Sequence, residues 1–214
     1  DFEGGDYLFC GINNYVTMCK DPVFWKSLGN TFIYLAIQVP VMVILSLILG
    51  VLVEESFLRF RTCYRVSVFL PSVTALVAYA MIFKLLFNTD FGLVNHILRT
   101  FGLGGVDWLN TVWGARAVVI MGITWRWTGY NMVFYLAGLQ NIEYSVYEAA
   151  KIDGANGWKT FWKITVPLLK PTIIMTFIMS INGTLQLFDE SVNLTKGGPA
   201  NSTITMSHYV YNTC

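Results

Sequence analysis

Residues 28–53 read LGNTFIYLAIQVPVMVILSLILGVLV and contain no charged residue. A helix needs about 20 mostly apolar residues to cross the hydrocarbon core of a bilayer, so this run can span it with some tilt. Pro40 lies inside the run, and a membrane helix tolerates proline where neighbouring groups satisfy the carbonyl that proline leaves free. The stretch therefore predicts a helix of an integral membrane protein.

Three further windows, 66–87, 117–140 and 171–188, are similarly poor in charge. Lys84 and Arg126 are the two charged residues in the four windows together, although charged residues make up 13% of the chain. In a soluble protein each helix would need a polar face. We therefore predict an all-α, polytopic membrane bundle with four spans. The third span is the weakest because Arg126 lies inside it, and the fourth is short.

Other classes of protein are disfavoured by what the chain contains. The formal net charge is +1, without a basic run that would bind nucleic acid. His96 and His208 are the two histidines, and the four cysteines are scattered, so metal and histidine-based catalytic sites lack candidate residues. No phosphate-binding G-x-x-x-x-G-K-[ST] run is present. We expect no catalytic residue, metal or cofactor in this chain; Cys10 and Cys19 share a flank and can pair if that flank is oxidising.

The distribution of Lys and Arg predicts the orientation in the membrane. With four spans, segments 54–65 and 141–170 share one side, and their cations are Arg59, Arg61, Arg65, Lys151, Lys159, Lys163 and Lys170. The longer segments on the other side hold Lys20, Lys26, Arg99, Arg116 and Lys196, together with acids that include Asp189 and Glu190. Cations are therefore denser in 54–65 and 141–170, which we expect to be cytoplasmic.

The long cytoplasmic connection reads NIEYSVYEAAKIDGANGWKTFWKITVPLLK over residues 141–170. Ser145 and Glu148 have the spacing of a capping box, and Gly154 supplies a residue that readily ends a helix. A second helical stretch, 158–164, carries aromatic side chains among lysines, and prolines follow it. We predict two short helices joined at an angle beside the membrane. Their apolar surface indicates a docked partner, the alternative being an interfacial amphipathic loop without one.

The same connection resembles a known motif. Glu148–Ala150, Asp153–Ala155 and Ile164–Pro167 are similar, in identity and spacing, to the EAA loop of the membrane subunits of binding-protein-dependent ABC importers. One departure is Glu143, which stands where the family usually has proline. The resemblance implies that this loop couples the chain to ATPase subunits. The coupling residues that it implies are Glu148, Ala149, Ala150, Asp153 and Gly154.

The resemblance extends over nearly the whole chain and points to the maltose-type sugar permeases. Asn30-Thr31, Phe69-Leu70-Pro71 and Leu194–Pro199, the last read as an LTxGGP loop, are similar to their helix entries and outer loop. By this mapping the four spans are helices two to five of a six-helix core, so we expect the chain to be truncated at both ends.

The family resemblance also implies partners and a location. The chain would be a multi-pass protein of a bacterial or archaeal cytoplasmic membrane, in contact with lipid. It would work with two cytoplasmic ABC ATPase subunits that bind the ATP, a companion permease subunit that is a different chain, and an external solute-binding protein. Its own role would be transport of a sugar or oligosaccharide, without catalysis.

Candidate residues of the solute path come from both spacing and resemblance. Ser180, Thr184 and Leu187 have the i, i+4, i+7 spacing of one helical face, and they align with sugar-contacting positions of the family's fifth helix. The other candidates are Ser72, Leu76, Tyr79, Ile123, Arg126, Trp127, Asn182 and Gly183. Hydroxyl and amide groups can hydrogen bond sugar hydroxyls, and aromatic rings can stack on a sugar's apolar face. For each Ser or Thr, helix–helix packing is an equally good explanation.

Arg126 is the most specific single prediction, because a guanidinium within a span must face the bundle, a water-filled cavity or an acid. It can bind an anionic group of the solute or pair with an acid of a missing partner subunit. Alternative functions are a permease of the same superfamily for glycerol phosphate, amino acids or peptides, a passive channel, and a membrane enzyme. The enzyme is disfavoured because the predicted spans contain no Asp, Glu or His.

Overall fold

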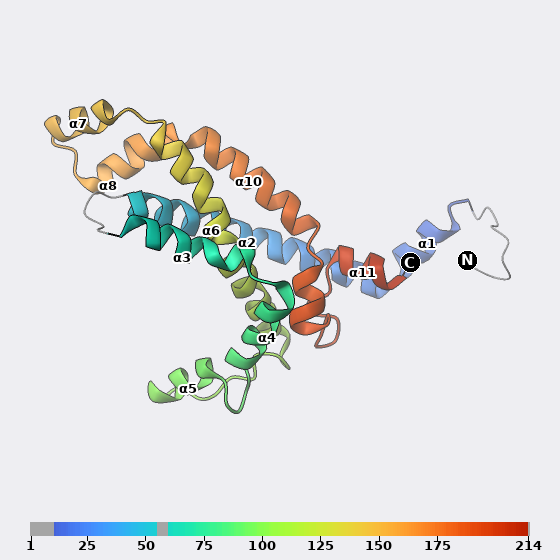
Figure 1. The fold of residues 1–214 in the computed structure, drawn as a ribbon. Helices are drawn as coiled ribbons and strands as arrows, with labels where there is room; N and C mark the ends of the chain where they lie inside the picture. Colours follow the sequence, from blue (N-terminus) through green and yellow to red (C-terminus); the bar gives the residue numbers. More distant parts are fainter. Residues whose placement is uncertain (1–10, 55–59, 214) are drawn as a thin grey trace.

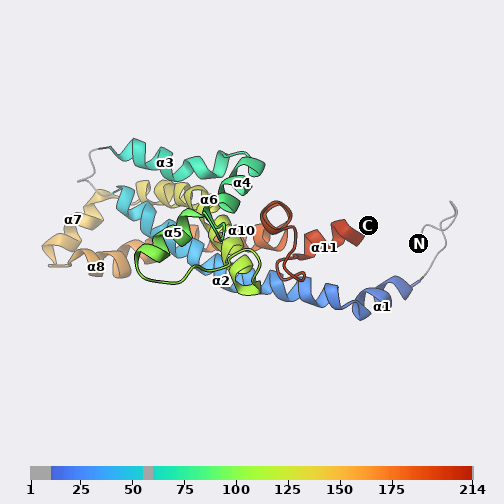
Figure 2. The ribbon, with the colours of Figure 1, turned by 90° about the horizontal axis from the view of Figure 1, so that it is seen from below.

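The structure is a computed structural model that describes residues 11–54 and 60–213, and these residues form helices and connections without a strand (Figure 1). The elements in chain order are α1 (Asn13–Lys20), α2 (Pro22–Glu54), α3 (Arg61–Val73), α4 (Leu76–Leu86), α5 (Leu93–Thr100), α6 (Val112–Gln140), α7 (Tyr144–Ile152), α8 (Gly157–Thr160), η1 (Phe161–Thr165), α9 (Val166–Leu168), α10 (Lys170–Leu185), η2 (Ser191–Thr195) and α11 (Met206–Thr213). The chain is elongated: α7 and α8 lie at one end, and α1 and α11 at the opposite end (Figures 1 and 2).

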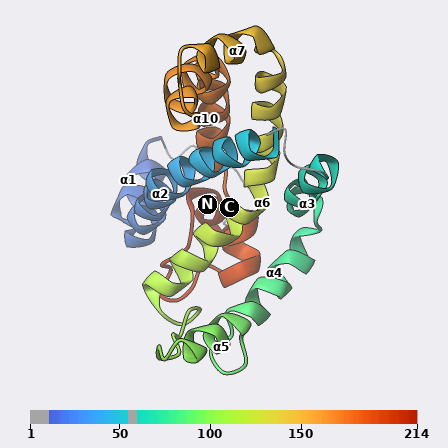
Figure 3. The same ribbon diagram turned by 90° about the vertical axis from the view of Figure 1, so that its left-hand side faces the viewer.

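The two longest helices, α2 and α6, form the centre of the bundle and pack along each other. Gly50 permits the close approach, because a Cβ there would lie 3.1 Å from the Cβ of Tyr135. Helices α3 and α10 flank this pair on different sides (Figures 1 and 3). The largest buried cluster is built from Tyr34, Tyr79, Phe83, Val118 and neighbouring side chains, so the core joins α2, α4 and α6.

Among the described residues, α2 alone is a single helix both long and apolar enough to cross a membrane. Two bent pairs also qualify if each counts as one span: α3 with α4, and Gly157–Leu168 with α10. Helix α6 has 29 residues but is not apolar enough to qualify on its own, as its interior Arg126 suggested. The four predicted windows therefore correspond to α2, the α3–α4 pair, α6 and α10.

The window 66–87, predicted as one span, consists of two helices that meet at 99°. The backbone is extended at Thr74 and Ala75, where ψ is 137° and 130°. The sequence explains the break, because Pro71 removes a backbone donor near the end of α3 and the Ser72 hydroxyl donates to the Phe69 carbonyl oxygen at 2.7 Å. The predicted span is therefore divided into two helices by a sharp bend.

Helices α3 and α6 touch through their backbones. A Cβ on Gly129 of α6 would lie only 1.9 Å from the carbonyl oxygen of Val68 on α3. Real Cβ atoms do not come this close, so a larger residue at 129 would push α3 away from α6. Gly129 is therefore required for this contact.

The connection between α6 and α10 contains the predicted pair of short helices. Gly154, with φ of +73°, follows α7 in the left-handed conformation that favours glycine. The predicted capping box is absent, because α7 begins one residue before Ser145 and the Ser145 hydroxyl donates to the Glu143 carboxylate at 3.2 Å. Asn156 caps α8 instead, its side chain accepting a hydrogen bond from the Lys159 amide at 2.9 Å.

After α8 the chain breaks once before α10, in the region where Pro167 and Pro171 predict a break. It remains helical through η1 and α9 to Leu168, and bends by 69° before α10 begins. Pro171 lies in the first turn of α10, where a missing backbone donor costs nothing. Pro167 lies within the continuous helical run, directly after the π-helical turn η1 and Val166. The bend thus falls between the two prolines.

Candidate solute-binding cavity

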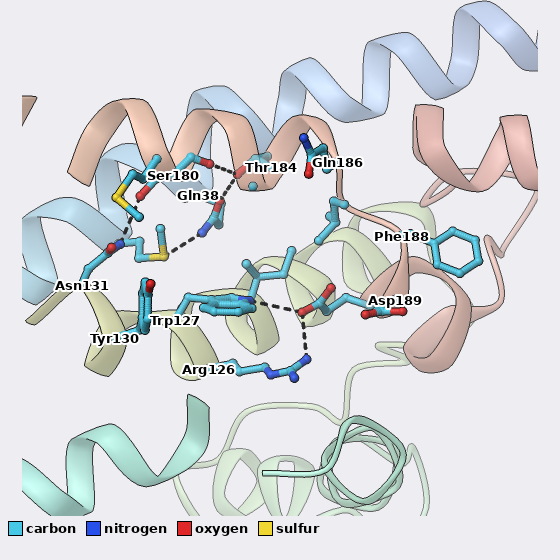
Figure 4. A pocket seen from close by; sticks show the side chains of 16 residues that line it. Gln38, Arg126, Trp127, Tyr130, Asn131, Ser180, Thr184, Gln186, Phe188 and Asp189 are labelled. Carbon is cyan, nitrogen blue, oxygen red and sulfur yellow. Dashed lines mark hydrogen bonds and ion pairs between the residues drawn. The ribbon is translucent and has the colours of Figure 1, made fainter. Parts of the chain in front are cut away.

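A cavity of about 520 Å³ lies between α2, α6, α10 and the segment that follows α10 (Figure 4). Its lining is mainly aromatic and apolar, with polar groups from every wall. The lining residues are Gln38, Met42, Ile123, Arg126, Trp127, Tyr130, Asn131, Met179, Ser180, Gly183, Thr184, Gln186, Leu187, Phe188, Asp189 and Glu190. Concave sites of this size and lining are typical of small-molecule binding sites.

Two hydrogen bonds join α10 to the opposite walls of the cavity. The Thr184 hydroxyl donates to the side-chain oxygen of Gln38 on α2 at 3.0 Å, and the Asn131 amide of α6 donates to the Ser180 hydroxyl at 3.1 Å. Figure 4 shows both pairs pointing toward one another. Ser180 and Thr184 therefore line the cavity and also hold helices together, so both explanations offered for them apply.

The Arg126 guanidinium faces an acid of its own chain. Its Nη1 lies 3.4 Å from Oε1 of Glu190, and the indole N–H of Trp127 donates to the same oxygen at 3.4 Å (Figure 4). The guanidinium also lies 5.3 Å from the centre of the Trp127 ring and 5.6 Å from that of Tyr79. The sequence analysis considered an anionic solute group or an acid of a partner subunit as the partner of Arg126. The acid that faces Arg126 in the structure, Glu190, belongs to the same chain.

Glu190 was not a candidate from sequence, because it follows the fourth apolar window and was assigned to the outer connection. After α10 ends at Leu185, the segment that follows places Glu190 directly before η2, with its side chain 5% exposed. Burial raises the pKa of the Glu190 carboxyl, an effect that the Arg126 charge and the Trp127 hydrogen bond oppose. The sequence feature that could have indicated Glu190 was Arg126, because an acid is one of the environments that a guanidinium within a span can face.

Seven of the eleven predicted path residues line the cavity, namely Ile123, Arg126, Trp127, Ser180, Gly183, Thr184 and Leu187. The other four lie elsewhere. Tyr79 and Leu76 belong to the neighbouring buried cluster, and Ser72 bonds within α3. Asn182 is exposed on α10, where its side chain accepts a hydrogen bond from Gln186 at 3.2 Å. The helical spacing brings Ser180, Thr184 and Leu187 to the same cavity.

The connection after η2 is held against α2 and α6 by a polar network. The Arg116 guanidinium donates to the Ser202 carbonyl oxygen at 3.0 Å and to the Asn30 side-chain oxygen at 2.8 Å. The Asn30 amide in turn donates to the carbonyl oxygens of Asn201 and Ile204 at 3.0 and 2.9 Å. Asn30 and Arg116 therefore fix the loop that carries the LTxGGP pattern.

The predicted coupling residues belong to α7 and the turn that follows it, at one end of the molecule (Figures 1 and 2), and none of them lines the cavity. Glu148, Ala149, Asp153 and Gly154 are exposed, whereas Ala150 is buried. Beside them, large apolar side chains are exposed in the described structure, including Ile152, Trp158 and Trp162. The α7–α8 end is thus a protruding surface of exposed acidic and aromatic groups.

The sequence analysis also considered metal ligands and a disulfide. Residues 11–54 and 60–213 contain no group of three His, Cys, Asp or Glu side chains that could hold a metal ion. Cys10 lies outside the described residues, so its suggested pairing with Cys19 lies outside them as well.

A helical bundle with an apolar cavity that contains several polar groups, and with a protruding end of short helices, is typical of a membrane transport component. Residues 22–213 match the family described as binding-protein-dependent transport system inner membrane component, and the chain belongs to that family.

The chain is similar to permease proteins of several sugar transport systems. It is 50% identical over 208 residues to the lactose transport system permease LacF of Rhizobium radiobacter, covering 95% of this chain and 70% of the relative. It is 34% identical to the arabinooligosaccharide permease AraP of Bacillus subtilis, covering 97% and 66%, and 34% identical to the trehalose/maltose permease MalF of Thermococcus litoralis, covering 95% and 69%. The chain therefore spans about two thirds of the length of these relatives.

Solved structures have the same fold. A bacterial alginate ABC transporter, crystallised in complex with an alginate pentasaccharide-bound periplasmic protein, aligns with a TM-score of 0.82 at 25% identity, covering 94% of this chain and 71% of that one. A bacterial importer of alginate aligns with a TM-score of 0.86 at 24% identity, covering 95% and 72%. The predicted all-α permease fold and the resemblance to sugar permeases are confirmed.

Proposed function

We propose that the chain is the permease subunit of an ATP-driven importer and forms one side of the path by which a sugar or oligosaccharide crosses the membrane. The observation that carries this proposal is the cavity between α2, α6 and α10, which combines aromatic rings with hydroxyl and amide groups. Sugars present hydroxyls around their edges and apolar C–H faces, so the same combination suits them. The sugar permeases among the relatives support this substrate class.

The cytoplasmic partner docks at the α7–α8 end. Glu148 offers an exposed carboxylate, Ala149 keeps one side of α7 small, and Gly154 forms the sharp turn after the helix. We assign ATP binding and hydrolysis to two partner subunits that receive this end. Neighbouring exposed Ile152 and Trp158 provide apolar area that an interface would bury.

A companion permease subunit, a different chain, completes the path, and an external solute-binding protein delivers the sugar to the outer loops. The periplasmic protein in the alginate transporter complex supports the last assignment. The membrane is the cytoplasmic membrane of a bacterium or archaeon, with α7 and α8 on the cytoplasmic side, where the density of Lys and Arg is higher.

Reconstitution of the complete importer in proteoliposomes tests the proposal. We expect ATP-dependent accumulation of at least one labelled sugar from a panel of mono- and oligosaccharides, dependent on the binding protein. Uptake of amino acids or glycerol phosphate with no sugar uptake would assign the chain to another branch of the superfamily. ATP-independent flux of unrelated solutes would instead support a channel.

A further inference from the structure

The charges that line the cavity are unevenly matched. Three of its lining residues carry ionisable charge: Arg126, Asp189 and Glu190. Arg126 faces Glu190, whose carboxylate lies 3.4 Å from the guanidinium, and Asp189 is an exposed second carboxylate beside the pair. Two carboxylates stand against a single guanidinium, so this wall carries no surplus positive charge.

The arrangement around Arg126 leaves little room for another anion. Its side chain is 14% exposed, and the rings of Trp127 and Tyr79 lie within 6 Å of the guanidinium. The indole N–H of Trp127, a second donor aimed into this region, is directed at the same Glu190 oxygen. The Nε of Arg126 is buried and has no hydrogen-bond partner among the described residues. An anionic group of a solute that approached Nη1 of Arg126 or the Trp127 indole would therefore have to displace Glu190, and would meet Asp189 while doing so.

An uncharged sugar meets no such obstacle. The remaining polar groups on the cavity wall, including Gln38, Asn131 and Thr184, are neutral donors and acceptors, and Trp127 and Tyr130 offer aromatic surface. Specificity can come from unfavourable contacts with the wrong ligand as well as from favourable contacts with the right one. The carboxylate of an acidic sugar would lose its hydration in this cavity without pairing with an unoccupied cation.

We infer that Glu190 is a specificity-determining residue: by occupying Arg126, it restricts this chain's side of the path to uncharged saccharides and rejects sugars that carry a carboxylate or sulfonate. The inference rests on the proposed function, because it concerns the solute of the same cavity. It also assigns Arg126 to holding Glu190 instead of to binding an anionic solute.

The test is direct sugar binding to the complete importer complex in nanodiscs, without the binding protein, so that the permease alone selects. Matched pairs differ in one carboxylate: cellobiose with cellobiouronic acid, and lactose with the acid oxidised at its C6′. For at least one pair we expect the neutral sugar to bind at least about tenfold more tightly, a ratio that corresponds to 1.4 kcal/mol. If the neutral and the acidic sugar bind with equal affinity in both pairs, the inference is overturned before any variant is made.

Variants identify the residue responsible. Glu190→Gln frees Arg126, so we expect affinity for the acidic sugar to rise about tenfold, as a charge-assisted hydrogen bond allows. Asp189→Asn is the matched control: it removes one negative charge from the same cavity without releasing Arg126, so its gain should be clearly smaller. The double variant Arg126→Gln, Glu190→Gln should lose the gain. Equal gains from Glu190→Gln and Asp189→Asn would overturn the role of Glu190.

A parallel uptake measurement separates this inference from the proposed function. If no sugar of either kind is transported by the full importer, the proposed function is wrong. If sugars are transported and the acidic members bind as tightly as the neutral ones, the proposed function stands and the inference alone fails. The protein level of each variant in the membrane is measured alongside.

Discussion

The Thr184 hydroxyl of α10 donates a hydrogen bond to the side-chain oxygen of Gln38, which lies 146 residues earlier on α2. The Ser180 carbonyl oxygen, 2.8 Å away within the same helix, is a second acceptor for this single hydroxyl proton. Both side chains of the interhelical pair are buried. The contact thus joins two distant parts of the chain on the wall of the cavity.

Replacing Thr184 by Val should remove this link while keeping the shape of the side chain. The Gln38 oxygen would then be buried without its donor, which we expect to cost about 1 kcal/mol, with interhelical hydrogen bonds in membranes averaging somewhat less. Thermal unfolding of the purified complex measures the effect. Thr184→Ser, which retains the hydroxyl, is the control, and a Thr184→Val change as well tolerated as Thr184→Ser would argue against the link.

Breaking the Arg126–Glu190 pair from one side should be more damaging than removing both charges. Arg126→Gln leaves a buried carboxylate without its cation, a situation that typically costs about 3–5 kcal/mol. The double variant Arg126→Gln, Glu190→Gln removes that penalty, so we expect it to recover much of the lost thermal stability. A double variant less stable than Arg126→Gln would show that the pair does not act as described.

Gly129→Ala should separate α3 from α6. The added Cβ would lie 1.9 Å from the Val68 carbonyl oxygen, so the two backbones cannot keep their present distance. We expect a loss of stability of about 1–3 kcal/mol, the range typical of overpacked sites. Gly183→Ala is the control for stability, because a Cβ there meets no atom within 4 Å. Equal melting temperatures for the two variants would contradict the backbone contact.

Charge reversal in α7 should uncouple the ATPase subunits. We expect Glu148→Lys, and Gly154→Asp at the left-handed turn, to insert normally into the membrane but to lose co-purification of the ATPase. Asp90→Lys reverses an equally exposed carboxylate in the connection between α4 and α5, and should retain the ATPase. Normal recovery of the ATPase with Glu148→Lys and with Gly154→Asp would show that the ATPase docks elsewhere.

Arg116→Gln should loosen the loop that follows η2. Gln is too short to replace both hydrogen bonds, to Ser202 and to Asn30, that the guanidinium donates. We expect faster trypsin cleavage after the exposed Lys196 in nanodiscs. Arg99→Gln is the control. Within the described residues, the Arg99 side chain donates one hydrogen bond, to the Thr89 carbonyl oxygen at 3.3 Å, so its replacement should leave the rate of cleavage after Lys196 unchanged.

The sequence predicted those features that depend on local composition. The charge-free run around Pro40 is α2, and the spacing of Ser180 and Thr184 placed both on the cavity wall, because helical periodicity is a local property. The turn at Gly154 followed from the same reasoning. These predictions needed no knowledge of how the helices pack.

Features that depend on tertiary structure were missed. Glu190 was counted with the outer loops because it follows an apolar window, yet the turn after Leu185 returns it to Arg126. Hydropathy also joined α3 and α4 into one span, since it averages over the extended residues Thr74 and Ala75. Both features depend on a change in chain direction, which leaves the composition unaltered.

The geometry of α6 relates the two ends of the molecule mechanically. It is one uninterrupted helix of 29 residues, roughly 43 Å at about 1.5 Å per residue, and Arg126 lies near its middle. Three residues separate its end at Gln140 from the start of α7. A force applied to α7 would therefore act on a rigid lever whose midpoint carries the cavity's single cation, and a small tilt of that lever would reshape the wall on which a solute rests.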